Sequence, residues 1–184
     1  MASAKAGAGA DPRAPGIELT QPIVVGVDGS AGSAAALRWG LAEARLRRAP
    51  LNVVHAYQLP PLSMGDVAVA GPAGVGMAAV ASEDVDRLRA ASEAAGQRII
   101  EQTLEQANGD VTGVDIERTV IEGAAVPVLI DAGRDAALLV LGSRGRGGFA
   151  GLLLGSVSQQ CAQHPPCPVV ILPPVEEEDS SSGE

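Results

Sequence analysis

Four short runs of mostly apolar residues, separated by stretches with helical spacing, dominate the pattern of this sequence. They cover residues 23–28, 51–56, 137–141 and 167–172 and are rich in valine, leucine and isoleucine. Such runs are typical of strands that are buried on both faces of a parallel sheet. Residues 114–121 (VDIERTVI) alternate between apolar and polar side chains instead, which indicates a fifth strand with one solvated face.

The stretches between these strands predict helices. Residues 33–48 repeat small and apolar side chains at helical spacing, and Ser30 or Ser33 is a suitable N-terminal cap. The buried face of this helix is expected to contain Ala34, Leu37, Leu41 and Ala44. Further helices are expected over residues 82 to about 108, 124–133 and 156–163. This alternation predicts one doubly wound α/β domain, with a five-stranded parallel sheet and helices on both faces.

Three segments fall outside the alternating order. Residues 1–21 are rich in alanine, glycine and proline, and residues 174–184 (PVEEEDSSSGE) are acidic and rich in serine. Both compositions are typical of disordered tails, so the domain itself is expected to span residues 22–173. Residues 58–81 are rich in proline and glycine and predict a long, irregular crossover of unknown role.

The composition excludes several classes of partner. A formal net charge of −9 argues against a nucleic-acid binder, because phosphate backbones require a basic face. Aromatic residues make up only 2% of the chain, too few for base-stacking platforms. Residues 1–22 contain no apolar run of the kind that a secretory leader has, and no stretch reaches the roughly 20 apolar residues of a membrane span. We therefore expect a cytoplasmic protein without a membrane partner. Backbone amides still allow one small phosphorylated ligand.

The two cysteines, Cys161 and Cys167, flank a His-Pro-Pro sequence. They are too few for a structural zinc site, and no metal-ligating set is predicted elsewhere. We interpret them as two reduced, structural thiols, with a disulfide as the alternative.

Six glycines and two arginines, without any lysine or carboxylate, lie in residues 142–160 (GSRGRGGFAGLLLGSVSQQ). Gly142 ends the fourth apolar run and permits close approach of a ligand to the backbone, and Gly145 permits a turn. Gly155 and Ser156 then open a helix, whose free N–H groups and positive dipole end form an anion site. The loop between the two parts is long enough to cover a polyphosphate.

This spacing, G-x-x-G-x9-G-S, resembles the nucleotide-binding signature of the universal stress protein family, in its ATP-binding branch. Four other segments resemble the family in the same order. They are Ile-Val-Val-Gly-Val-Asp-Gly-Ser from residue 23, Val-His-Ala from residue 54, Glu-Gly from residue 122 and Cys-Pro-Val-Val from residue 167. The resemblance covers residues 20–173, apart from the 58–81 insert. One departure is the proline at position 127, which the family often has closer to Gly123.

The resemblance implies an adenine nucleotide α-hydrolase-like fold with strand order 3-2-1-4-5. It also implies a homodimer. We expect this dimer to form through the last strand, Val169 to Leu172, because a bare apolar edge invites aggregation.

The same resemblance implies the ligand, ATP with Mg²⁺, and the residues that bind it. Asp28 would take the ribose hydroxyls, and the backbone of Ala56 would take the adenine edge. The residues expected around the ribose and phosphates are Gly142, Gly145, Gly155, Ser156, Val157 and Ser158, with Gly29 and Ser30 nearby. Arg144 occupies a position that is often histidine or arginine in the family, and is included as a phosphate contact.

Several of these residues also have plainer interpretations. Asp28 suits a helix cap, and Arg144 with Arg146 suits a solvated pair in a loop. His55 is more typical of a buried, hydrogen-bonded histidine than of a catalytic base. No catalytic residue is predicted, since phosphoryl transfer requires a positioned base and charge clamps.

The function expected from the sequence is thus an ATP-binding stress-response module with an unknown protein partner and at most slow ATP hydrolysis. The alternatives are a genuine ATPase or adenine-nucleotide hydrolase, and an interaction protein that binds no nucleotide. The nucleotide-free branch of the family lacks the G-x-x-G-x9-G-S run, which argues against the last alternative.

Overall fold

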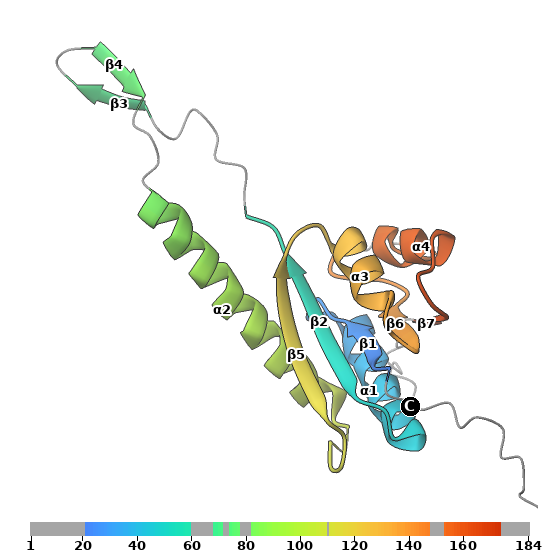
Figure 1. Cartoon of the computed structure of the whole chain (residues 1–184). Coiled ribbons are helices and arrows are strands. Elements are labelled where there is room, and N and C mark those ends of the chain that lie inside the picture. The colour runs from blue at the N-terminus through green and yellow to red at the C-terminus, as the bar shows by residue number, and fades with distance from the viewer. Residues whose placement is uncertain are drawn as a thin grey trace, which may run out of the picture.

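The computed structural model describes residues 21–59, 68–71, 74–77, 82–109, 111–147 and 153–173 (Figure 1). Five parallel strands form its main sheet, in the order β5-β2-β1-β6-β7. Their bounds are β1 Ile23–Gly26, β2 Leu51–Tyr57, β5 Ile116–Glu122, β6 Leu138–Gly142 and β7 Val169–Leu172. Counted along the chain, this order reads 3-2-1-4-5, so the predicted topology is confirmed.

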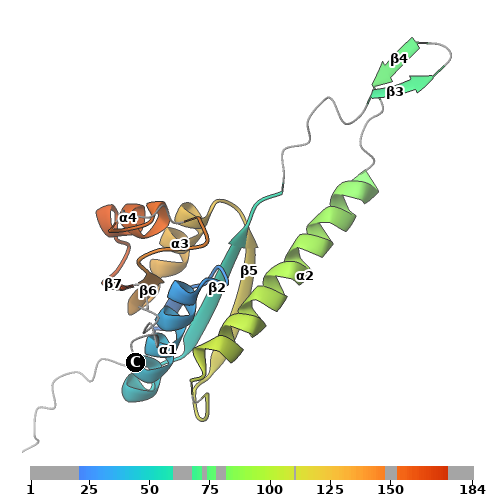
Figure 2. The same ribbon diagram turned by 180° about the vertical axis from the view of Figure 1, so that it is seen from behind.

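Two helices cover each face of the sheet (Figures 1 and 2). Helices α1 (Ala31–Arg47) and α2 (Ser82–Ala107) bury Leu37, Leu41 and Ile100 against one face. Helices α3 (Ala125–Gly133) and α4 (Ser156–Gln163) bury Val128, Leu129 and Cys161 against the other. All four residues expected on the buried face of α1 are buried: Ala34, Leu37, Leu41 and Ala44. Both cysteines are free thiols.

Part of the crossover after β2 forms a hairpin that the sequence did not predict. Strands β3 (Ala68–Gly71) and β4 (Gly74–Met77) form an antiparallel hairpin within the segment expected to be irregular. Glycines pair at its closing end, Gly71 opposite Gly74, and only two residues separate them, which is the commonest hairpin length. The described residues do not include the rest of residues 60–81 or residues 148–152. They also do not include residues 1–20 and 174–184, where the two tails are expected.

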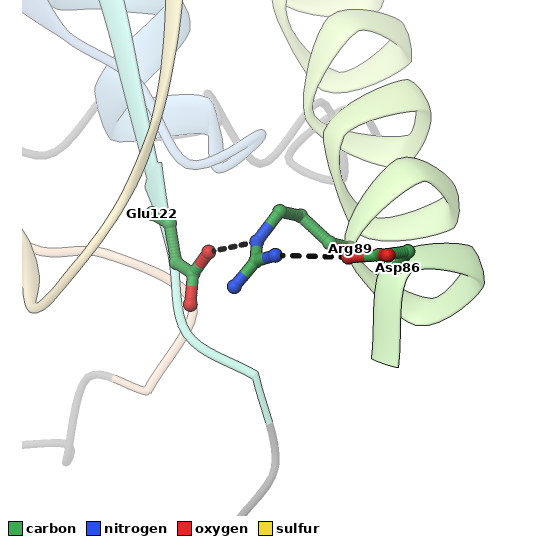
Figure 3. A network of polar contacts seen from close by, with 3 residues as sticks. All are labelled: Asp86, Arg89 and Glu122. Atoms are coloured by element: carbon green, nitrogen blue, oxygen red, sulfur yellow. Dashed lines mark hydrogen bonds and ion pairs between the residues drawn. The ribbon is translucent and has the colours of Figure 1, made fainter. Parts of the chain in front are cut away.

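The long helix α2 is buried mainly in its C-terminal half, where Ile100 and Ala107 are fully buried. Ala91, in the N-terminal half, is exposed, because this half of α2 extends past the sheet (Figure 1). An exposed ion pair joins this half to β5. The Nε of Arg89 lies 2.7 Å from Glu122 Oε2, and its Nη1 lies 3.4 Å from Asp86 Oδ1 (Figure 3). Such exposed pairs each contribute only about 0–1 kcal/mol.

The parallel strands all end at one edge of the sheet, so the residues that follow them gather there. Strand β1 ends at Gly26, β2 at Tyr57, β5 at Glu122 and β6 at Gly142. None of the helices in the described ranges has the length and apolar character to cross a membrane.

Candidate functional site

A cavity of about 480 Å³ lies at the carboxyl edge of the sheet, within the size range of small-molecule sites. Its apolar lining comes from the strand ends and α3, namely Gly26, Val27, Val54, Ala56, Ala125, Leu129 and Leu141. The rest of its lining comes from the end of β6 and the loop after it, the start of α4, the turn after β1 and the first turn of α1, namely Gly142, Arg144, Gly145, Arg146, Gly147, Leu154, Gly155, Ser156, Val157, Ser158, Asp28 and Ser33. The cavity therefore joins an apolar wall to a wall of backbone amides and arginines.

Asp28 connects the turn after β1 to the loop after β6. Its Oδ1 accepts hydrogen bonds from the N–H of Ser30 at 3.0 Å and from Ser30 Oγ at 2.6 Å. Its Oδ2 accepts from the N–H of Arg146 at 2.9 Å. Burial raises the pKa of Asp28, but the hydrogen bonds from Ser30 and Arg146 outweigh burial and hold the pKa below its ordinary value of 3.8. The carboxylate is therefore charged at neutral pH, beside the cavity.

Ser30 is the N-terminal cap of α1, as expected. Its Oγ accepts a hydrogen bond from the N–H of Ser33 at 3.2 Å. Asp28 is not the cap itself, as its plainer interpretation had it; it supports the cap through its two bonds to Ser30 and also lines the cavity.

Helix α4 begins at the cavity without a side-chain cap. Its N-terminal flanking residue is Gly155, whose own N–H donates to the carbonyl of Ser143 at 2.6 Å. The first intrahelical hydrogen bond runs from the N–H of Gln159 to Gly155. The amides of Ser156, Val157 and Ser158 precede that bond and form the open, positive end of the helix dipole.

The hydroxyl of Ser158 does not face solvent. Ser158 is buried, with 5% of its surface exposed, and its Oγ donates to the carbonyl of Gly142 at 2.6 Å. This bond ties α4 to the end of β6, so the hydroxyl holds the loop while the amide of the same residue lies in the open first turn.

Glycine is required at two positions of the loop after β6 because the backbone approaches other groups closely. A Cβ at Gly142 would lie 2.7 Å from the carbonyl carbon and oxygen of Gly32 in α1. A Cβ at Gly145 would collide with Oδ2 of Asp28. The first and second glycines of the G-x-x-G spacing thus let the loop lie against α1 and Asp28.

Strand β1 stops before β2 does. Its last paired residue, Gly26, lies opposite Val54, and the N–H of Val27 still donates to the carbonyl of Val54 at 2.9 Å. The carbonyl of Val27 then lies 2.8 Å from Nδ1 of His55. Because a carbonyl only accepts, Nδ1 carries the hydrogen. Ala56, two residues beyond Val54, has no β1 residue opposite it and lines the cavity.

Nine of the eleven residues predicted for the site line this one cavity: Asp28, Ala56, Gly142, Arg144, Gly145, Gly155, Ser156, Val157 and Ser158. Gly29 and Ser30 lie outside the lining; Gly29 has a positive φ of 81° in the turn before α1, and Ser30 serves as the cap. Within the described ranges, no group of three or more His, Cys, Asp or Glu side chains could hold a metal ion.

The sequence analysis missed part of the apolar wall, including Ala125 and Leu129 on α3. Their spacing of four residues places them on one helical face, which is the signal that could have identified them. Arg146 is exposed, in agreement with a solvated loop residue, but it also lines the cavity, and its backbone N–H donates to Asp28.

The chain is similar in sequence to known proteins. A family model described as "Universal stress protein family" matches residues 20–173. Universal stress protein Rv2623 of Mycobacterium tuberculosis (strain ATCC 25618 / H37Rv) is 35% identical over 161 residues, which cover 86% of this chain and 48% of that protein. Universal stress protein Mb2019 of Mycobacterium bovis is 34% identical over 154 residues, covering 82% of this chain and 47% of that protein. The chain thus spans about half the length of the curated relatives it matches.

Solved structures show the same fold. A universal stress protein crystallised in complex with cAMP is 26% identical, with a TM-score of 0.54 and coverage of 83% of this chain and 95% of that chain. Hypothetical protein MJ0577 gives a TM-score of 0.63 at 16% identity, with coverage of 84% of this chain and 96% of that chain, and is similar in fold alone.

Proposed function

The chain belongs to the universal stress protein family, and from this premise we propose that it binds ATP, together with Mg²⁺, in the cavity at the carboxyl edge of the sheet. The observation that carries this proposal is the uncapped start of α4, where Gly155, Ser156 and Val157 line the cavity. A helix start of this kind attracts phosphate through its free amides and its dipole. Arg144 and Arg146 are among the residues that line the same cavity, and both carry positive charge.

The other residues of the cavity fit the remaining parts of the nucleotide. Asp28 carries a negative charge at the cavity wall, and a carboxylate is a suitable acceptor for a ribose hydroxyl. The apolar wall of Val27, Val54 and Leu129 suits the faces of an adenine ring. The backbone of Ala56 would read the edge of the base.

No cluster of carboxylates is needed for the magnesium ion in this arrangement. Mg²⁺ keeps several waters and is commonly held by the phosphates of its nucleotide. It would enter with the triphosphate, while the amides of α4 hold the phosphate oxygens. The solved relative in complex with cAMP supports an adenine nucleotide as the ligand class.

We propose a regulatory, cytoplasmic role in the stress response, with slow ATP hydrolysis at most. Asp28 is the only carboxylate among the described residues that line the cavity, and both of its oxygens already accept hydrogen bonds. A carboxylate held in this way is a poor general base, because its pKa is lowered. A nucleotide-dependent change in the loop after β6 would be sensed by an unidentified protein partner.

The proposed assembly is a homodimer through β7. This strand lies at an edge of the sheet, and its four residues, Val169–Leu172, are apolar and only half-buried. A second copy would cover that edge about a two-fold axis. Sedimentation at micromolar concentration should give the dimer mass; a monomer throughout would refute this part of the proposal.

Isothermal titration of the purified chain with ATP and MgCl₂ at millimolar concentration tests the binding directly. We expect saturable binding near one nucleotide per chain, and phosphate release of no more than a few turnovers per hour. Absence of any heat of binding would refute the proposal. Fast turnover that is lost in a Ser156→Ala variant would instead favour a genuine ATPase.

A further inference from the structure

Strands β1 and β2 separate directly after the last backbone bond between them, from the N–H of Val27 to the carbonyl of Val54. In a regular parallel ladder the next bond would run from the N–H of Ala56 to the carbonyl of Val27. That carbonyl accepts from Nδ1 of His55 instead, at 2.8 Å, and the pairing ends at Gly26 opposite Val54. A side chain thus occupies the acceptor that would extend the ladder.

The peptide groups of Ala56 face the gap that results. The carbonyl of Tyr57 accepts from the N–H of Gly123, on the β5 side. Successive residues of a strand direct their peptide groups to opposite neighbours, so the N–H and C=O of Ala56 point to the β1 side, where β1 has already ended. Ala56 lines the cavity, so this donor and acceptor lie at its wall.

The imidazole of His55 lies on the other face of the sheet from the cavity. Val54 and Ala56 line the cavity, whereas His55, between them, does not and is only 9% exposed. Helix α2 leaves room for the ring through Gly96, where a Cβ would lie 3.0 Å from His55 Cδ2. The ring is therefore held by packing against α2 and by one hydrogen bond to Val27.

We propose that His55 is a positioning residue for base recognition. By satisfying the carbonyl of Val27, it keeps β1 and β2 apart and leaves one adjacent donor and acceptor, the N–H and C=O of Ala56, for the ligand. An adenine edge, which carries an acceptor next to an amino donor, matches this pair. The inference rests on the proposed nucleotide binding and adds to it the group that keeps the base site open. His55 itself touches no ligand.

The test distinguishes binding of the adenine base from binding of the phosphates. Titrations with ATP and with inorganic tripolyphosphate, both with Mg²⁺, compare the wild type with His55→Asn and His55→Gln. The amide nitrogen of asparagine lies near the position of Nδ1 and keeps a donor for Val27, whereas that of glutamine lies near the position of Nε2 and does not. We expect His55→Gln to bind ATP about 10-fold more weakly, the equivalent of one hydrogen bond, with tripolyphosphate binding unchanged. His55→Asn should keep the wild-type ratio of the two affinities.

Amide hydrogen exchange at Ala56 in the nucleotide-free protein gives a second readout. Exchange should slow in His55→Gln and in His55→Leu, because the N–H of Ala56 then bonds to Val27, and should stay fast in the wild type and in His55→Asn. The matched control is His164→Leu at the end of α4, which replaces the only other histidine of the chain and should alter neither readout.

The outcomes distinguish the two proposals. If the wild type binds ATP but His55→Gln loses affinity for ATP and tripolyphosphate by the same factor, or loses none, the role of His55 is refuted and the proposed function stands. If the wild type binds neither probe, the proposed function fails, and base positioning fails with it.

Discussion

Helices α1 and α4 both begin at the carboxyl edge of the sheet, beside the same cavity, but their first turns are completed in different ways. At α1 the protein supplies the cap: Ser30 Oγ accepts from Ser33, and Asp28 holds Ser30 in turn. At α4 the flanking residue is Gly155, and no side chain caps the helix. The first turn of α1 is thus capped by a side chain of the protein, whereas the first-turn amides of α4 stay open beside the cavity.

The difference bears on the proposed phosphate site, because the chain as a whole has a net charge of −9. The site does not depend on a basic surface, because backbone amides and a helix dipole provide the positive potential locally. The cap formed by Ser30, which Asp28 supports, stabilises α1. It also occupies an amide in the first turn of α1, so that this amide does not compete with those of α4 for the proposed ligand. Variants that add a cap to α4 or remove the cap of α1 therefore test this difference between the two helices.

Giving α4 the cap that α1 has is the strongest test. Gly155 has φ −73° and ψ 163°, a conformation that any residue adopts, so Gly155→Asp introduces a carboxylate without backbone strain. The carboxylate would bond to the first-turn amides and repel phosphate, and like charges in contact cost several kcal/mol, so ATP should bind at least about 100-fold more weakly. Titration calorimetry measures this loss.

Gly155→Ala is the control for that variant. Its Cβ would lie 3.4 Å from the carbonyl oxygen of Ser143 and adds no charge, so ATP affinity should fall by less than about 10-fold. The folded state of Gly155→Asp should be as stable as that of the wild type or more so by a few tenths of a kcal/mol, about the difference between glycine and a good cap. Wild-type affinity in Gly155→Asp would show that phosphate binds elsewhere.

Removing the charge of Asp28, which supports the cap of α1, should have the next largest effect, and this effect is on the free energy of unfolding. Asp28→Asn replaces one acceptor oxygen by a donor that would face an N–H, so the free energy of unfolding at pH 7 should fall by about 1–3 kcal/mol. The folded pKa of Asp28 is lowered, so its contribution is present above the unfolded pKa near 3.8 and is lost as the pH falls through the lower folded value.

Urea unfolding of the wild type and of Asp28→Asn at pH 7 and near pH 3 measures this dependence. The gap between the two proteins should be widest at pH 7 and should narrow under acid conditions. A gap of the same size at both pH values would mean that the charge of Asp28 contributes nothing to the fold.

Removing the cap of α1 should have the smallest effect. Ser30→Ala should lower the free energy of unfolding by about 1 kcal/mol, the usual cost of a lost serine cap. ATP affinity should change by less than about threefold, because Ser30 lies outside the cavity lining. Thermal unfolding and titration of the same sample measure both quantities. A large loss of affinity with unchanged stability would make Ser30 a ligand contact and remove the contrast between the two helices.

The sequence by itself determined the five strands of the main sheet, the four helices, their order and the loop that lines the cavity. Buried strands and amphipathic helices have distinct periods, and the spacing of Gly142, Gly145, Gly155 and Ser156 is local, so both can be recognised without a structure. Most of the cavity residues follow, because parallel strands end at the same edge of a sheet.

Only the tertiary structure decided how those ends meet. The bond from the N–H of Arg146 to Asp28 joins residues that are 118 positions apart, and the bond between His55 Nδ1 and the carbonyl of Val27 joins residues that are 28 positions apart. Leu129 enters the cavity wall because α3 packs across the strand ends. No local period encodes such contacts, since they arise when distant segments pack together and their polar groups compete for the same partners.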